Sequence, residues 1–266
     1  MIRFGASNGG TGNFLESIGE RIQKKIIKRR RKKLSALVAA SLSHTVAYGP
    51  FQGMKIFPEQ FWGYDQGSKC LGLYEAQIIA LLKQISDSGR RNIFIDVGGA
   101  DGYYAIGCLV GGLFLRSIAF EMTSEGRERI SRAALLNGVS DRVELHGEAD
   151  RHTISDVLSG LDMKKCVFLI DIEGAEFNLF TPELLASLAD AEIIMELHDF
   201  TETREKTKAY LGSIHSHDVK IINETPRDPR SLRELRNLHD NDCWLLMSEG
   251  RQNGMDWAHL TPKKCK

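Results

Sequence analysis

Several acidic residues and one histidine stand directly after apolar segments of the chain. Short apolar runs bounded by turn residues are typical of strands that are buried on both faces. The carboxyl ends of parallel strands meet along one edge of a sheet, so side chains far apart in the sequence come to share one cleft. Carboxylates and an imidazole in one cleft can bind hydroxyl groups, move protons or hold a hard cation. The residues are Asp96, Glu121, Asp171, Glu173, Glu196, His198 and Asp199.

The first of these acids precedes a glycine-rich turn. Asp96 follows the apolar run 93–95, and Gly98, Gly99 and Gly102 follow it before a segment compatible with a helix. Glycines let the backbone turn tightly and let a ligand approach the main chain. The free N–H groups of the next helix face whatever lies over the turn. This pattern predicts the ligand-binding end of a doubly wound sheet, although its spacing is not the GxGxxG of dinucleotide enzymes.

A second acid fits the same site. Glu121 ends the apolar segment 117–122 and lies 23 residues after Gly98. An acid about 20 residues beyond such a turn binds ribose hydroxyls, because both hydroxyls of one ribose can donate to one carboxylate. Together the turn and Glu121 predict a cofactor that contains a nucleoside. The alternative interpretation is an ordinary strand, turn and helix with a glutamate on the surface.

The elements that would position these residues alternate along the chain. This alternation predicts an α/β fold, a doubly wound (Rossmann-like) sheet of seven strands, with the last two strands as an antiparallel pair. We expect a basic helical extension over 1–45, a lead-in hairpin and helix over 46–90, and the main domain over 91–266. The expected strands are 93–95, 117–122, 142–146, 167–170, 192–197, 219–222 and 243–247, and the expected helices include 71–86, 123–137, 153–161 and 202–216.

Charge is distributed unevenly over the chain. The net charge is zero, but residues 1–45 hold ten Lys and Arg and only two acids, so the remainder is mildly acidic. An acidic main domain argues against a nucleic-acid groove and against a nucleic-acid partner. The basic stretch 24–33 predicts an amphipathic helix that either touches an anionic membrane or an acidic partner, or packs on the main domain. The five cysteines lack metal-ligand spacing and are odd in number, which favours a reduced, cytoplasmic compartment. Peripheral contact with a membrane through 24–33 is compatible with that compartment.

Three stretches together resemble one enzyme family. The turn IDVGGADGYY, the run FLIDIEGAEFNLF at 168–180 and the run IMELHDF at 194–200 resemble the FkbM family of S-adenosylmethionine-dependent methyltransferases. The resemblance covers about 92–200 and does not extend to the first 45 residues. It implies the methyltransferase variant of the doubly wound sheet, in which the seventh strand is inserted antiparallel. Ala100 stands where the family often has Asn, so no side-chain contact to the cofactor is expected there.

The resemblance also implies roles for individual residues. It places S-adenosylmethionine over the turn, with its methionine part near the glycines, its ribose on Glu121 and its adenine near the residues after the third strand. The implied cofactor-binding residues are Asp96, Gly98, Gly99, Gly102, Glu121, Glu148 and Ala149. The candidate catalytic residues follow instead from their chemistry and their places after the fourth and fifth expected strands, and they are His198, Asp171 and Glu173.

Methyl transfer from a sulfonium needs alignment of the acceptor and exclusion of water. A hydroxyl acceptor also benefits from a base or a metal. We expect His198 to be the base, because its ordinary pKa is near 6.5; its alternative role is a structural hydrogen bond. Asp171 would orient the acceptor beside Glu173. Mg²⁺ on Asp171 with Glu173 or Asp199 is possible but not favoured.

Four arginines follow the sixth expected strand at intervals of three residues. They would form one basic face on a helix or turn, which either binds an anionic acceptor such as a phosphorylated sugar or is simply solvated. They are Arg227, Arg230, Arg233 and Arg236.

The sequence therefore predicts a methyltransferase that uses S-adenosylmethionine to methylate a hydroxyl of a sugar, glycan or other small molecule. One alternative is an NAD-dependent oxidoreductase, against which the turn spacing and the absence of a Tyr-x-x-x-Lys pair argue. The other is a non-catalytic, membrane-associated binding module, against which the retained acids of the cofactor site argue.

Overall fold

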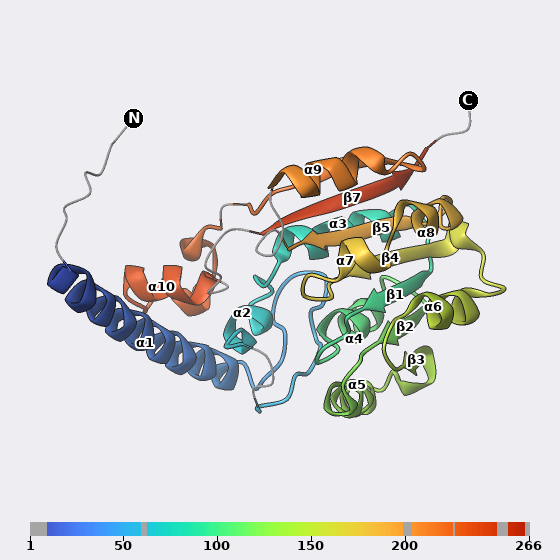
Figure 1. The fold of residues 1–266 in the computed structure, drawn as a ribbon. Coiled ribbons are helices and arrows are strands. Elements are labelled where there is room, and N and C mark those ends of the chain that lie inside the picture. Colours follow the sequence, from blue (N-terminus) through green and yellow to red (C-terminus); the bar gives the residue numbers. More distant parts are fainter. Residues whose placement is uncertain (1–9, 60–62, 199–203, 226, 249–254, 264–266) are drawn as a thin grey trace.

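The structure, a computed structural model, describes residues 10–59, 63–198, 204–225, 227–248 and 255–263. Its centre is one sheet with the strand order β3-β2-β1-β4-β5-β7-β6 (Figure 1). The pairs among β1 to β5 are parallel, and β7 is antiparallel to both β5 and β6. The predicted fold class is confirmed. The strands are β1 (Ile93–Val97), β2 (Arg116–Phe120), β3 (Val143–His146), β4 (Cys166–Ile170), β5 (Glu192–Leu197), β6 (His217–Ile222) and β7 (Asp256–Pro262).

Helices cover both faces of the sheet. One hydrophobic cluster joins the sheet to α3 (Ala76–Asp87), α4 (Tyr103–Val110) and α5 (Ser124–Leu136). A second cluster joins the opposite face to α6 (Arg151–Leu158), α7 (Glu176–Leu179), α8 (Pro182–Ser187) and α9 (Arg204–Ser213). With both faces covered, β1 and β4 are buried along nearly their whole length, as the continuous apolar runs predict. The turn after β1 therefore opens between the ends of β2 and β4.

Two helix starts follow directly from their capping residues. The Thr123 side chain accepts a hydrogen bond from the Gly126 N–H at the start of α5. The Thr181 side chain accepts one from the Leu184 N–H at the start of α8, where Pro182 is the first helical residue. Both caps satisfy an N–H group that has no partner within its helix.

The prediction of a strand over 243–247 is wrong. These residues form the end of α10 (Asp240–Met247), and the seventh strand is β7. Five apolar residues cannot by themselves distinguish a buried helix from a strand. Cys243, Leu246 and Met247 have helical spacing and pack in a separate cluster with Leu34. Because only this side of the segment is buried, the segment forms a helix and not a strand.

The segment before β1 also differs from expectation. No extended hairpin forms in the described part of 46–64, where a single bridge joins Thr45 to Lys55. The helix expected over 71–86 begins only at Ala76, as α3, and a turn over 71–75 separates it from the short helix α2 (Gln66–Cys70). The cause is Gly72, whose φ of +66° is left-handed and whose added Cβ would lie 2.2 Å from the Tyr48 carbonyl oxygen. A helix cannot continue through that position.

The basic N-terminal segment is one long helix, α1 (Gly10–Ser41). Its C-terminal part packs on the body, where Leu34 and Val38 join the cluster that contains α10. Arg30 pairs with Asp242 of α10, and Arg31 pairs with Asp65. Along the described residues, no helix combines the length and the apolar character that crossing a bilayer requires.

Candidate active site

The glycine turn is tightly enclosed by its neighbouring strands. The N–H groups of Gly98 and Gly99 donate to the Phe120 carbonyl at the end of β2, over 3.0 and 2.9 Å. Gly98 has a φ of +101°, and a Cβ added to it would lie 1.7 Å from the carbonyl oxygen of Asp171. Any side chain at Gly98 would thus displace the loop after β4. The turn after β1 is fixed against the two loops between which a ligand would lie.

Glu121 holds this turn from the end of β2. Its Oε2 accepts a hydrogen bond from the Ala100 N–H at 3.0 Å, and its Oε1 accepts from the N–H and the hydroxyl of Thr123 at 2.7 and 2.6 Å. Ala100 itself is left-handed, with φ of +46°. The carboxylate is therefore held in place before any ligand arrives, and Oε2, which accepts only one of these three hydrogen bonds, keeps a lone pair for a further donor.

Asp96 lies beneath the turn rather than at its surface. The residue is 1% exposed, and its Oδ2 accepts a hydrogen bond from the Ala105 N–H of α4 at 3.1 Å. Burial, reinforced by the charges of Asp101 and Glu121 and opposed by the Ala105 N–H, raises the pKa of Asp96 to about 7. Asp96 thus ties the start of α4 to β1.

The remaining residues predicted for the cofactor lie at the same edge of the sheet. Gly102 ends the turn with φ of +81° and leads into α4. Glu148 and Ala149 follow β3 at the edge predicted for the adenine; Glu148 is exposed and Ala149 packs against the core. The loop that carries them ends in a capping box at Asp150 and Thr153, which starts α6.

The three residues predicted to be catalytic come together after β4 and β5. His198 follows β5 and is 5% exposed. Its Nε2 lies 3.2 Å from Glu196 Oε2, 3.7 Å from Asp171 Oδ1 and 3.8 Å from Glu173 Oε2. Asp199, the other residue considered there, lies outside the described part of the chain.

Glu176 is a member of this cluster that the sequence analysis missed. Its Oε1 lies 2.8 Å from His198 Nδ1 and accepts hydrogen bonds from the N–H groups of Ile172 and Gly174 at 2.9 and 3.2 Å. The carboxylate is almost fully buried. The short spacing of three acids in DIEGAE was the available signal, because such a loop can return its last acid to the strand end.

The carboxylates determine the charge of the histidine. Burial disfavours the imidazolium, but the hydrogen bonds and charges of Glu176 and Glu196 outweigh burial and raise the pKa of His198 to about 10. Burial and the neighbouring Glu196 raise the pKa of Asp171 well above its ordinary value. In this arrangement His198 is protonated at neutral pH, so the ordinary imidazole pKa that motivated its role as a base does not apply.

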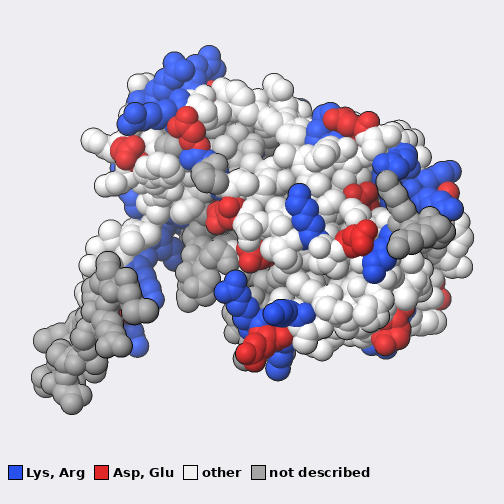
Figure 2. Space-filling view, turned by 90° about the horizontal axis from the view of Figure 1, so that it is seen from above, with Lys and Arg blue, Asp and Glu red and all other residues white. Residues whose placement is uncertain are grey.

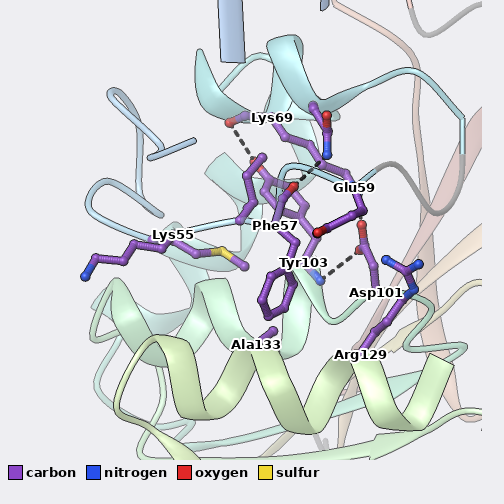
Figure 3. Close-up of a pocket in the computed structure, with 11 residues that line it drawn as sticks. Lys55, Phe57, Glu59, Lys69, Asp101, Tyr103, Arg129 and Ala133 are labelled. Carbon is purple, nitrogen blue, oxygen red and sulfur yellow. Dashed lines mark hydrogen bonds and ion pairs between the residues drawn. The ribbon is translucent and has the colours of Figure 1, made fainter. Parts of the chain in front are cut away.

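A pocket beside the turn brings in residues that the sequence analysis did not single out. We call it the turn pocket (Figure 3). Lys69 Nζ lies 2.8 Å from Asp101 Oδ2 and about 5 Å from the ring centroids of Tyr74 and Tyr103. Its lining residues are Met54, Lys55, Ile56, Phe57, Glu59, Gln66, Lys69, Asp101, Tyr103, Arg129 and Ala133. The only sequence signal was the position of Asp101 inside the glycine turn.

The four arginines after β6 do not share one helix face. Short 3-10 turns at Pro229–Ser231 and Arg233–Leu235 replace the continuous helix or turn that one face would need. The Arg227 side chain points inward and donates to the Met247 carbonyl at 2.5 Å, whereas Arg230 and Arg233 are exposed. The interpretation as a single basic face is therefore not supported.

Comparison with known proteins adds to this geometry. No protein-family model and no curated protein sequence matches the chain. Among solved structures, the METTL16 MTase domain is similar with a TM-score of 0.56 and 12% identity, over 87% of this chain and 80% of that one. Cofactor-bound Rv0187 from MTB is similar with a TM-score of 0.50 and 16% identity, over 71% of this chain and 82% of that one.

The chain has the Rossmann-like methyltransferase fold. An NAD-dependent dehydrogenase would not need the antiparallel β7 between β5 and β6, so this alternative is not favoured. The resemblance to the FkbM family stays a prediction, because no family model matches.

Proposed function

We propose that the protein is an S-adenosylmethionine-dependent methyltransferase that methylates a hydroxyl group of a sugar, glycan or other small molecule. One observation supports the proposal most. A pre-formed glycine turn with an anchored Glu121 lies beside a cluster of carboxylates around His198, at the same edge of a methyltransferase-type sheet. The first part suits a nucleoside cofactor, and the second suits an acceptor that must lose a proton.

The cofactor would lie across the ends of β1 and β2. Glu121 would receive the ribose hydroxyls, and the loop of Glu148 and Ala149 would lie along the adenine. The methionine part carries one ammonium and one carboxylate group. Lys69 and Asp101 offer the opposite charges next to the turn, so we place this part there, with the sulfonium directed toward β4.

The acceptor would lie against the loops after β4 and β5. Asp171 and Glu173 would bind and orient its hydroxyl group, while Glu176 and Glu196 hold His198 in place. The acid-rich surroundings suit a positively charged sulfonium and stabilise it near the acceptor. Because His198 is protonated in this arrangement, we propose that it orients the surrounding carboxylates and balances their negative charge. Asp171 is then the nearest group to take the proton of the acceptor hydroxyl.

A transfer assay with labelled S-adenosylmethionine tests the proposal. We expect label to appear on hydroxyl compounds in a panel of sugars and glycans. His198→Ala should lower turnover by about 10²-fold, the cost of misplacing the groups that orient the acceptor, and leave affinity for S-adenosylhomocysteine unchanged. His259→Ala, which removes a histidine paired with Glu192 elsewhere, is the matched control. Transfer only to amines or thiols, with turnover unaffected by His198→Ala, would contradict the hydroxyl assignment.

We further propose that α1 contacts an anionic membrane surface through the exposed residues of the stretch 24–33, of which Arg31 is excluded because it is buried against Asp65. Residues 19–30 are all exposed, including Ile22, Ile26 and Ile27, and the contacts of this stretch with the body are those of Lys28 with Tyr64 and of Arg30 with Asp242 among the described residues. Figure 2 shows Lys and Arg side chains along the arm that projects from the body. Exposed isoleucines among lysines and arginines suit the boundary between headgroups and acyl chains. A helix that only packed on the body would bury such residues.

A further inference from the structure

Three side chains after β4 and β5 offer one ligand atom each within a small volume. The ligand atoms of Asp171, Glu196 and His198 all lie within 4.8 Å of one another. A transition-metal dication binds oxygen and nitrogen ligands at about 2.0–2.2 Å, which places neighbouring ligand atoms about 3.0–3.6 Å apart. The distances from His198 Nε2 to Glu196 Oε2 and Asp171 Oδ1 are 3.2 and 3.7 Å. The spacing therefore fits ligands of a single ion with little movement.

The second observation is a buried oxygen atom. Asp171 Oδ1 is shielded from solvent and has no hydrogen-bond donor among the described residues, and the neighbouring Glu196 offers it only another carboxyl group. The 3.7 Å separation of Oδ1 from His198 Nε2 is too long for a hydrogen bond. A buried carboxylate oxygen without a partner is costly, and structures that retain one call for an explanation. A cation between Asp171, Glu196 and His198 would give this oxygen its partner.

The histidine is also oriented as metal-binding histidines are. Its Nδ1 faces Glu176 Oε1 at 2.8 Å, and backbone N–H groups hold Glu176 in turn. A carboxylate on one ring nitrogen fixes the ring orientation, and a metal ion that binds the other nitrogen would displace the proton which that nitrogen carries in the metal-free site. In this ring the other nitrogen is Nε2, which faces Asp171, Glu196 and Glu173.

We infer that Asp171, Glu196 and His198 bind a first-row transition-metal dication such as Mn²⁺, with Glu176 as the positioning residue. An imidazole ligand favours such an ion over Mg²⁺, which prefers oxygen ligands alone. This ligand set differs from the Asp171, Glu173 and Asp199 set considered for Mg²⁺. Glu173, whose side chain is 81% exposed, marks the solvent side, where coordination positions stay open.

The role of the ion rests on the proposed function, whereas its binding does not. At the open positions a dication would take the hydroxyl oxygen of the acceptor and lower the pKa of that hydroxyl. It would also balance four carboxylates that otherwise surround one imidazole, namely Asp171, Glu173, Glu176 and Glu196.

The test is a titration of the chelator-treated full chain with Mn²⁺, in which the electron paramagnetic resonance signal of free Mn²⁺ measures how much remains unbound. We expect one tight site per chain. Glu176→Gln should weaken it about 10–100-fold, the range for an outer-shell partner. Asp171→Asn and Glu196→Gln, which keep side-chain size, should weaken it more. His259→Asn is the matched control and should bind as the wild type does.

The outcomes of the Mn²⁺ titration either support or overturn the metal site. No binding at millimolar Mn²⁺, or equal binding by the wild type, Asp171→Asn and Glu196→Gln in chains with unchanged circular dichroism, would overturn the inference. S-adenosylhomocysteine affinity, measured on the same samples, separates the two proposals. Mn²⁺ bound at this site without any affinity for S-adenosylhomocysteine would sustain the metal site and refute the methyltransferase function.

Discussion

At the scale of single residues, the site combines buried charge with tight anchoring. Glu121, Glu176 and Asp96 each accept hydrogen bonds from backbone N–H groups of the loops or helices that they fix. Ionised acceptors make such bonds stronger than neutral ones do. These carboxylates therefore hold the backbone around the candidate site in place without any ligand.

Asp96 leads to a prediction about stability. Its pKa is about 7 in the folded chain against 3.8 when unperturbed, so the folded state retains a proton that the unfolded state has lost. The free energy of unfolding should therefore fall as pH rises from about 4 to 7, by about 4 kcal/mol from this group, and stay lower above that range. Asp96→Asn should remove that part of the decline. Urea unfolding of both chains at pH 5 and pH 8 measures the difference, and parallel profiles would contradict it.

At the scale of elements, burial decides what the local sequence leaves open. The apolar run 243–247 becomes the end of α10 because only one of its sides faces the cluster with α1. β7 is a strand because it lies between β5 and β6 and pairs with both. Each outcome depends on partners that are distant in the sequence. The described contacts of α1 with the body likewise begin at Lys28, which lies over the Tyr64 ring, and at Arg30, which pairs with Asp242.

The exposed part of α1 gives a prediction about membranes. The wild-type chain should sediment with vesicles that contain phosphatidylserine at low salt and less at high salt, because charge contributes much of the binding. Replacing Lys24, Lys25 and Lys28 by Gln should lose about 1 kcal/mol for each charge, or roughly 150-fold in total.

A control variant separates this effect from nonspecific hydrophobic adsorption to the vesicles. Leu115 is 68% exposed on a different surface, so Leu115→Ser should leave sedimentation unchanged. If the wild-type chain stays in the supernatant at low salt, the membrane contact is refuted and the exposed part of α1 serves some other partner.

At the scale of the whole molecule, the part of the site that is local in sequence could be predicted. The strand, turn and acid of 93–102 lie together in the chain, and so do the acids of DIEGAE. The charge state of His198 could not be predicted, because it depends on Glu176 and Glu196 converging on one ring. Lys69 could not be predicted either, because only the packing of α2 against the turn brings it to Asp101.

The order of the strands explains why so much of the site lies at one edge. β1 lies between β2 and β4, and β5 follows β4. The chain direction is the same in all of these strands, so Glu121, Asp171 and His198 each emerge at their carboxyl ends. A cofactor over β1 and β2 would therefore lie next to an acceptor over β4 and β5.

Calorimetric titration with S-adenosylhomocysteine and, separately, with NADH tests the central claim most directly. We predict that S-adenosylhomocysteine binds and NADH does not. Glu121→Gln should weaken binding by about 1–3 kcal/mol, the range for a charged hydrogen bond lost within a site. Glu125→Gln, at a glutamate whose side chain is 68% exposed on α5, should bind as the wild type does. Binding of NADH in place of S-adenosylhomocysteine, or equal S-adenosylhomocysteine affinity in wild type and Glu121→Gln, would contradict the account.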